Sequence, residues 1–168
     1  MMYNINWWVV AASAIIPFII GFIWYHPKVM GTIWMKESDV NPEDTNFIRW
    51  PVALAIMAVM YFFLSFGLLY AVVHQLHIFS TVMGNPALND PGSELNYLLK
   101  TLIEKYGTNY RTFRHGALHG AIAALTFAAP VVTINSLFEN KSIRYILIHI
   151  GYWVISFTLT GAIICGLA

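Results

Sequence analysis

Four stretches of the chain contain no Asp, Glu, Lys or Arg, and each is longer than 20 residues. An α-helix rises about 1.5 Å per residue, so about 20 apolar residues cross the hydrocarbon core of a bilayer. All 9 Lys and Arg and all 8 Asp and Glu lie outside these stretches, a partition that no soluble domain needs. The sequence therefore predicts membrane-spanning helices at residues 5–25, 51–73, 116–138 and 145–167.

Cysteine is nearly absent as well, because Cys165 is the only one. A single cysteine excludes an intrachain disulfide and argues against a cysteine-based metal site. Since Cys165 falls near the end of the fourth apolar stretch, we expect it to act as a small buried hydrophobe.

Charge is scarce and balanced: charged residues make up 10% of the chain, the formal net charge is +1, and no block of like charge occurs. Nothing therefore favours a nucleic-acid partner. The apolar stretches lack the acidic residue typical of proton-coupled transporters and the arginines of voltage sensors. No phosphate-binding loop, nucleophile elbow or paired carboxylate is present, so we expect a non-enzymatic protein without a cofactor.

The expected fold is all-α: a single domain over residues 1–168, formed by a four-helix transmembrane bundle with short interfacial helices. Only residues 139–141 separate the third helix from Ser142, the expected cap of the fourth, so these two helices should form an antiparallel hairpin. Residues 28–36 show the apolar spacing of a short helix in the interface plane. Ser93 can cap an amphipathic helix over residues 93–106, which we expect to rest on the bilayer surface or on a partner subunit.

Local signals predict the boundaries of the first two spans. Pro17 should kink the first helix, because it lacks an amide hydrogen. Asn41 is a good N-cap for the second helix, and Pro51 should mark a bend where that helix enters lipid. Apolar character continues past His74 to Val82, which favours a second helix that projects beyond the far membrane surface.

Four crossings place both termini and the second loop on one side of the membrane. The first and third loops together carry five Lys and Arg, whereas the second loop carries four. Positive residues are enriched in cytoplasmic loops, so this difference favours termini on the outside.

Small residues recur at every fourth position of the third span, at Gly116, Gly120, Ala124 and Ala128. Inside lipid, such a stripe lets another helix approach closely and so marks a packing face. The sequence leaves open whether the partner helix belongs to the same chain.

Two histidine pairs border the membrane at the same surface. His74 and His77 are three residues apart at the end of the second span, and His115 and His119 are four apart at the start of the third. Both spacings place two imidazoles on one helix face. If the four imidazoles converge, they could bind Zn²⁺ or another transition metal. The alternative is that they are simply histidines suited to a half-wet interface.

His149 lies about two turns into the fourth span, which makes it the most deeply embedded histidine. An ionisable group at that depth is a functional candidate. A hydrogen bond to a neighbouring helix, for instance near Tyr25, is the alternative explanation.

Short motifs at both ends of the chain carry a family resemblance. They are Trp24-Tyr25-His26-Pro27 with Gly31, Trp34, Met35 and Lys36; Leu137-Phe138-Glu139; and His149, Gly151, Tyr152 and Gly161. This pattern resembles an uncharacterised bacterial membrane family, domain of unknown function 1761. The resemblance implies a four-helix protein of the bacterial inner membrane and no established reaction. His149 stands where the family pattern has Asn, so a polar group is retained there.

The motifs at the two ends of the chain fall on the side of the first and third loops. Polar and aromatic groups could therefore meet in one shallow pocket or helix contact, formed by Tyr25, Trp34, Glu139, His149 and Tyr152. The alternative is that these residues only fix the ends of the helix hairpins.

Taken together, the small-residue stripe and the amphipathic helix favour a membrane scaffold or accessory subunit that works through helix packing in a homo-oligomer or a larger complex. The alternative is a small-solute or metal-ion carrier that uses the histidine-rich surface.

Overall fold

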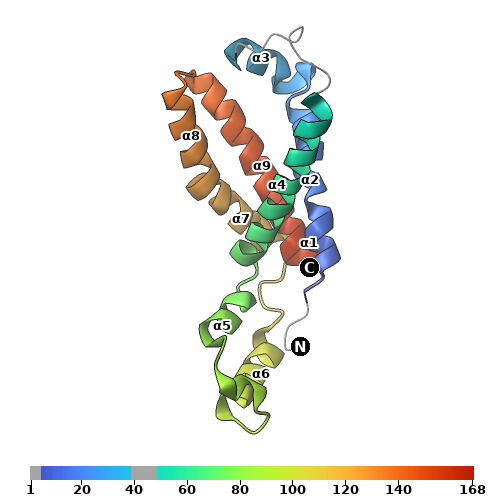
Figure 1. Ribbon diagram of the computed structural model, residues 1–168, viewed down its shortest axis with the longest axis vertical. Helices are drawn as coiled ribbons and strands as arrows, with labels where there is room; N and C mark the ends of the chain where they lie inside the picture. The colour runs from blue at the N-terminus through green and yellow to red at the C-terminus, as the bar shows by residue number, and fades with distance from the viewer. Residues whose placement is uncertain (1–4, 39–48) are drawn as a thin grey trace.

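The computed structural model describes residues 5–38 and 49–168, and it folds almost entirely into helices (Figure 1). The elements in chain order are α1 (Trp7–Ser13), α2 (Ile15–Trp24), η1 (Pro27–Gly31), α3 (Thr32–Ser38), α4 (Arg49–Val72), α5 (Gln75–Val82), η3 (Pro86–Asn89), α6 (Glu94–Tyr106), α7 (Phe113–Ala123), η4 (Ala124–Ala128), α8 (Ala129–Phe138) and α9 (Ile143–Leu167). The elements η1 and η4 are π-helical turns, and η3 is a 3-10 turn.

Four helical segments are long and apolar enough to cross a bilayer, which confirms the predicted fold class. They are Trp7–Trp24, Trp50–Val72, Phe113–Phe138 and Ile143–Leu167. Large apolar side chains on these segments are exposed, with Phe22 and Phe127 each at 72%. Exposed rings at this depth contact lipid rather than water, so the chain is a multi-pass membrane protein in contact with the bilayer.

Contacts between loops define the two ends of the bundle. At one end, the Lys141 ammonium donates to the carbonyl oxygen of Ser38, 3.1 Å away, so the first and third loops meet. At the other end, Arg111 Nε donates to the carbonyl oxygen of Cys165 at 3.0 Å, so the second loop lies beside the end of α9. This arrangement is that of four consecutive crossings.

Helices α7 and α9 pack backbone to backbone, and glycine makes this possible. A Cβ atom built on Gly116 would lie 2.2 Å from the carbonyl oxygen of Gly161, and one built on Gly120 would lie 2.2 Å from that of Phe157. The small-residue stripe of the third span is therefore occupied by a helix of the same chain.

The π-helical turn η4 interrupts that stripe. Ala124 is fully buried, but Ala128 at the end of the turn is only partly buried. A π-turn adds a residue to one helical turn and rotates the following face. The buried position in the next segment is Ser136, eight residues after Ala128.

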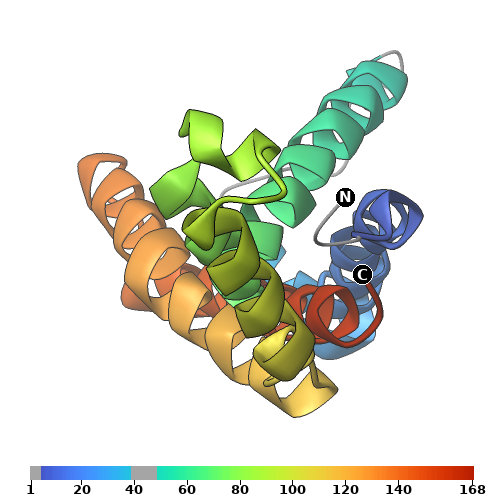
Figure 2. The ribbon, with the colours of Figure 1, turned by 90° about the horizontal axis from the view of Figure 1, so that it is seen from below.

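The first half of α4 leans away from the α8 hairpin, as the end-on view shows (Figure 2). Helix α2 is held to α9 instead: Trp24 Nε1 donates to the carbonyl oxygen of Ile148 at 3.0 Å. A Cβ atom on Gly151 would lie 2.9 Å from the Trp24 ring, so the missing side chain lets the indole approach α9 closely.

Helix boundaries follow the local signals in part. The first span breaks at Ala14, between α1 and α2, where Pro17 cannot donate to the carbonyl oxygen of Ser13. The expected continuation of the second span to Val82 is wrong, because α4 ends at Val72 and α5 begins at Gln75. The predicted cap at Asn41 lies outside the described residues.

The amphipathic helix forms as α6, where the Ser93 hydroxyl accepts from the amide of Asn96 at 3.1 Å. Together α5 and α6 project beyond the end of the bundle (Figure 1). The buried Gln75 amide joins α5 to the end of α6, donating to the carbonyl oxygen of Tyr106 at 3.4 Å and to that of Asn109, just beyond α6, at 2.8 Å. Leu98 on α6 stays 60% exposed, so an apolar part of the helix is left for lipid or a partner.

Candidate functional site

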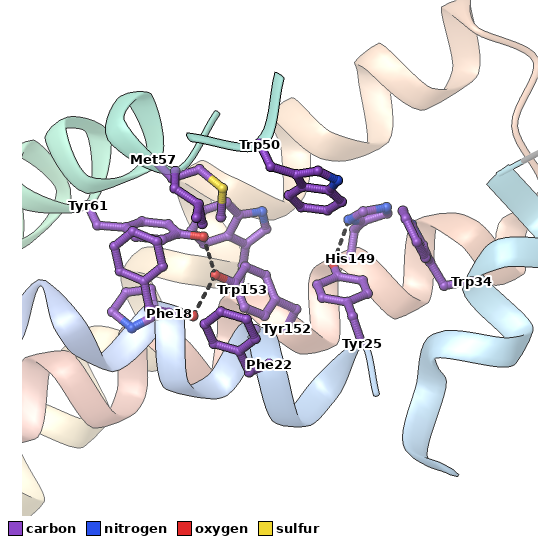
Figure 3. Close-up of a pocket in the computed structure, with 13 residues that line it drawn as sticks. Phe18, Phe22, Tyr25, Trp34, Trp50, Met57, Tyr61, His149, Tyr152 and Trp153 are labelled. Carbon is purple, nitrogen blue, oxygen red and sulfur yellow. Dashed lines mark hydrogen bonds between the residues drawn. The ribbon is translucent and has the colours of Figure 1, made fainter. Parts of the chain in front are cut away.

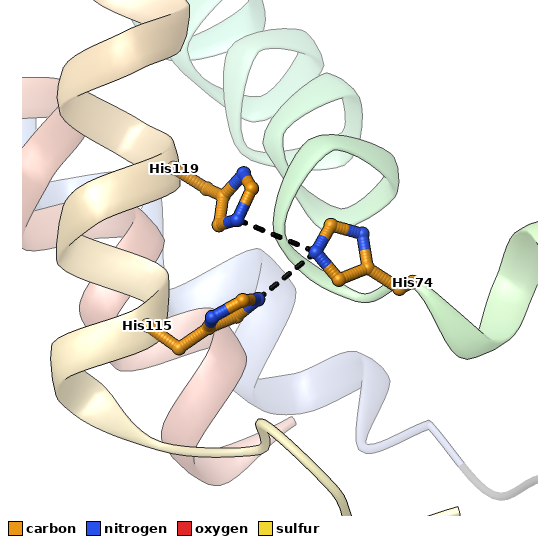
Figure 4. Close-up of side chains that lie close together, drawn as sticks. All are labelled: His74, His115 and His119. Carbon is orange, nitrogen blue, oxygen red and sulfur yellow. Dashed lines mark hydrogen bonds between the residues drawn. The ribbon is translucent and has the colours of Figure 1, made fainter.

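Three of the four interfacial histidines meet at one point (Figure 4). His115 Nε2 lies 2.9 Å from His74 Nε2, and His119 Nε2 lies 3.4 Å from the same atom. One ligand nitrogen from each ring lies within 4.8 Å of the other two. We call this cluster of His74, His115 and His119 the histidine triad.

Local structure explains why these side chains converge. The Thr112 hydroxyl caps α7 by accepting from the amide of His115 at 3.2 Å, which places His115 in the first turn. His119 follows one turn later on the same face. His74 stands at the turn between α4 and α5, and in Figure 4 its imidazole points across to α7.

His77 does not join the triad. Its Nε2 lies 2.8 Å from the carbonyl oxygen of Tyr70, to which it donates. That bond satisfies one of the last carbonyl groups of α4, which have no partner within the helix. The predicted pair separates because the chain turns at His74, so His77 belongs to a different helix from the end of α4.

The electrostatics of the triad favour a neutral imidazole at His74. Partial removal from water lowers the pKa of His74 below its ordinary value of 6.5, and the positive charges that His119, His115 and His77 would carry lower it further. At pH 7 the His74 ring is therefore neutral, which is the form that binds metal ions. In the apo protein, the part of the free energy of unfolding that depends on a neutral His74 is present above pH 6.5. It is lost as the pH falls toward the lowered pKa of His74.

The spacing of the triad suits a tetrahedral metal ion. Imidazole nitrogens bind Zn²⁺ at about 2.0–2.1 Å, so two nitrogens on one ion are about 3.3 Å apart. Two of the three separations, 2.9 and 3.4 Å, bracket that value, and each ligand nitrogen lies within 4.8 Å of the other two. Within the described part of the chain, no carboxylate or thiolate belongs to the cluster. Three nitrogen ligands leave a fourth position for water or a second molecule.

At the opposite end of the bundle, four of the five residues predicted for a polar pocket line one cavity (Figure 3). Tyr25 Oη lies 2.8 Å from Nδ1 of His149, and the Tyr25 ring also contacts Trp34 and Tyr152, with ring centroids 5.4 Å apart in each pair. Glu139 does not line this cavity; it is exposed beyond the end of α8.

A comparison with known families decides the classification. The family described as "Protein of unknown function (DUF1761)" matches residues 8–165. The chain belongs to this family. No curated protein and no solved structure matches it. Membership in DUF1761 agrees with the resemblance in the motifs and assigns no reaction.

Part of the site in this DUF1761 protein lies outside the sequence prediction. Helix α4 contributes Trp50, Leu54, Met57 and Tyr61 to the cavity wall, at spacings of four, three and four residues. Such spacing places the side chains on one helix face. That periodicity is the signal that could have identified this wall.

Proposed function

We propose that this protein binds a divalent transition metal, most suitably Zn²⁺, at the histidine triad, and that it acts as a non-enzymatic metal-binding membrane protein. The observation that carries the proposal is the convergence of three imidazole nitrogens, two from α7 and one from the turn between α4 and α5, within 4.8 Å. Imidazole ligands suit zinc, copper and nickel, and only a neutral ring can supply the required lone pair.

Position argues for metal binding rather than transport. The triad lies at the membrane surface that carries α5 and α6, and its rings are partly exposed. The four apolar stretches carry no acidic side chain that could pass a cation on toward the other surface. A bound ion would instead connect the end of α4 to the first two turns of α7.

Titration calorimetry with ZnCl₂ tests this proposal on protein purified in detergent without a polyhistidine tag. We expect one zinc ion per chain at pH 7.5. His119→Ala should weaken binding by more than about 100-fold, because loss of a ligand costs at least as much as loss of an outer-shell partner. His77→Ala should bind as the wild type does, since His77 borders the triad but bonds to Tyr70.

Two results would contradict the zinc proposal. One is a wild-type protein that takes up no zinc at micromolar concentration. The other is an equal loss of affinity in His77→Ala and His119→Ala, because that would indicate loose surface binding by any nearby histidine.

The scaffold hypothesis stays a second proposal. Its strongest support in the sequence was the stripe at Gly116 and Gly120, which α9 occupies. The exposed apolar side chains of α6, such as Leu98, still favour a partner subunit or a second copy. Native mass spectrometry that shows only single chains in mild detergent would count against it. A bacterial inner-membrane location with both termini outside is part of the same proposal.

A further inference from the structure

A second site lies at the opposite end of the helix bundle from the triad, in the cavity between α2, α4 and α9. Its volume is about 520 Å³. The lining residues are almost all aromatic or aliphatic: Pro17, Phe18, Gly21, Phe22, Tyr25, Trp34, Trp50, Leu54, Met57, Tyr61, His149, Tyr152 and Trp153. We call this cavity the aromatic pocket. None of its residues is acidic, Lys or Arg, so a charged ligand would find no counter-ion there.

Hydroxyl groups at one end of the aromatic pocket satisfy one another. Tyr152 Oη donates to the carbonyl oxygen of Pro17 at 3.0 Å, and Tyr61 Oη lies 2.7 Å from Tyr152 Oη (Figure 3). Because Tyr152 uses its hydrogen on Pro17, Tyr61 donates to Tyr152. This end therefore has no donor left for a ligand.

The other end has two nitrogen atoms without partners. Nε2 of His149 and Nε1 of Trp34 are both buried, and neither has a hydrogen-bond partner among the described residues. A buried donor without an acceptor is costly, and few native groups are left in that state. Two such groups in one apolar pocket indicate a missing acceptor.

The hydrogen bond with Tyr25 determines which ring nitrogen of His149 carries the hydrogen. Its phenol is a stronger acid than a neutral imidazole, so Tyr25 donates to His149 Nδ1 across the 2.8 Å contact. The ring hydrogen then lies on Nε2. Trp34 Nε1 is a donor in any state. Both unpartnered nitrogens therefore carry a hydrogen that has no acceptor.

We propose that the aromatic pocket binds a neutral, membrane-dissolved molecule that presents a carbonyl oxygen on a flat ring, as the head group of a quinone does. The carbonyl accepts from His149 Nε2 and Trp34 Nε1, and the ring packs against the surrounding aromatic side chains. Trp50 lies at the same end of the pocket in Figure 3, and its side chain is 46% exposed.

The test is a titration with ubiquinone-1 of the full-length protein in nanodiscs, read by calorimetry. Trp34→Phe keeps a ring but removes the donor, and His149→Leu removes the other donor; each should weaken binding by about tenfold. His149→Asn supplies an amide donor and should recover most of the affinity. Trp8→Phe is the matched control, because Trp8 is 85% exposed and lines no part of the aromatic pocket.

Several outcomes would overturn this proposal. Binding that is equal in wild type, Trp34→Phe and His149→Leu would exclude the two donors. Competition by a diacylglycerol as strong as that by the quinone would show that an ester carbonyl without a ring suffices. Trp34→Phe keeps the test decisive if His149→Leu fails to fold. Repeating the titration with a metal chelator should leave quinone affinity unchanged, which separates this site from the histidine triad.

Discussion

Replacing Gly116 with valine is expected to destabilise the folded protein by more than about 3 kcal/mol, beyond the usual cost of an overpacked core. The new Cβ would lie 2.2 Å from the carbonyl oxygen of Gly161 and 2.5 Å from the Cβ of Cys165. Neither neighbour is the flexible end of a side chain, so α7 and α9 would have to separate. The loss should appear as a lower midpoint of unfolding in detergent.

Gly67→Val is the matched control for that change. Gly67 also lies inside a membrane span, but a Cβ atom there meets nothing within 4 Å. Valine should therefore cost nothing, and its better helix propensity gains a few tenths of a kcal/mol. Equal destabilisation by the two substitutions would show that α7 and α9 do not pack as described.

Zinc should stabilise the folded protein strongly, which is the second large effect that we expect. The triad forms only when the end of α4 sits against α7, so the unfolded chain offers no equivalent site. At a free zinc concentration 100 times the dissociation constant, the free energy of unfolding should rise by about 2.7 kcal/mol. Thermal unfolding with and without ZnCl₂ measures this rise.

The zinc effect should depend on the triad alone. His115→Ala is expected to abolish the stabilisation, whereas His77→Ala should retain it because that ring bonds to Tyr70. A rise of the same size in His115→Ala would mean that zinc stabilises the protein through some other group.

The membrane spans could be predicted because lipid imposes a strict rule. A charged side chain is costly in the hydrocarbon core, so the uncharged stretches coincide with the long helices. Helix capping could also be predicted, because it depends on local sequence: Ser93 caps α6, as its side chain indicated. What the sequence left open was the partner of Gly116 and Gly120, because a stripe shows that a helix approaches but not which one.

The histidine triad could be predicted only in part. Spacing placed His115 and His119 on one face, and topology placed His74 at the same surface. No local signal predicted that α4 would end at Val72, because the residues beyond it stay apolar. That turn separates His77 from His74, and it depends on packing between distant segments rather than on local propensity.

The aromatic pocket was predicted from one side only. Tyr25, Trp34 and His149 belong to the motifs at the two ends of the chain and were expected to meet. The wall formed by α4 was missed because the pocket was predicted from the motifs at the two ends of the chain, and α4 carries none of those motifs. Glu139 was included because it closes a motif, yet its carboxylate is exposed, since the end of α8 leaves the membrane there.

The ligand set of bound zinc is the most direct test of the central claim, and X-ray absorption at the zinc edge of the loaded protein measures it. We predict three nitrogen ligands at about 2.0–2.1 Å with imidazole scattering, and a fourth light ligand such as water. A sulfur ligand at about 2.3 Å would contradict this prediction, because it would assign the metal to Cys165 instead of the three histidines. Fewer than two imidazole ligands would contradict it as well.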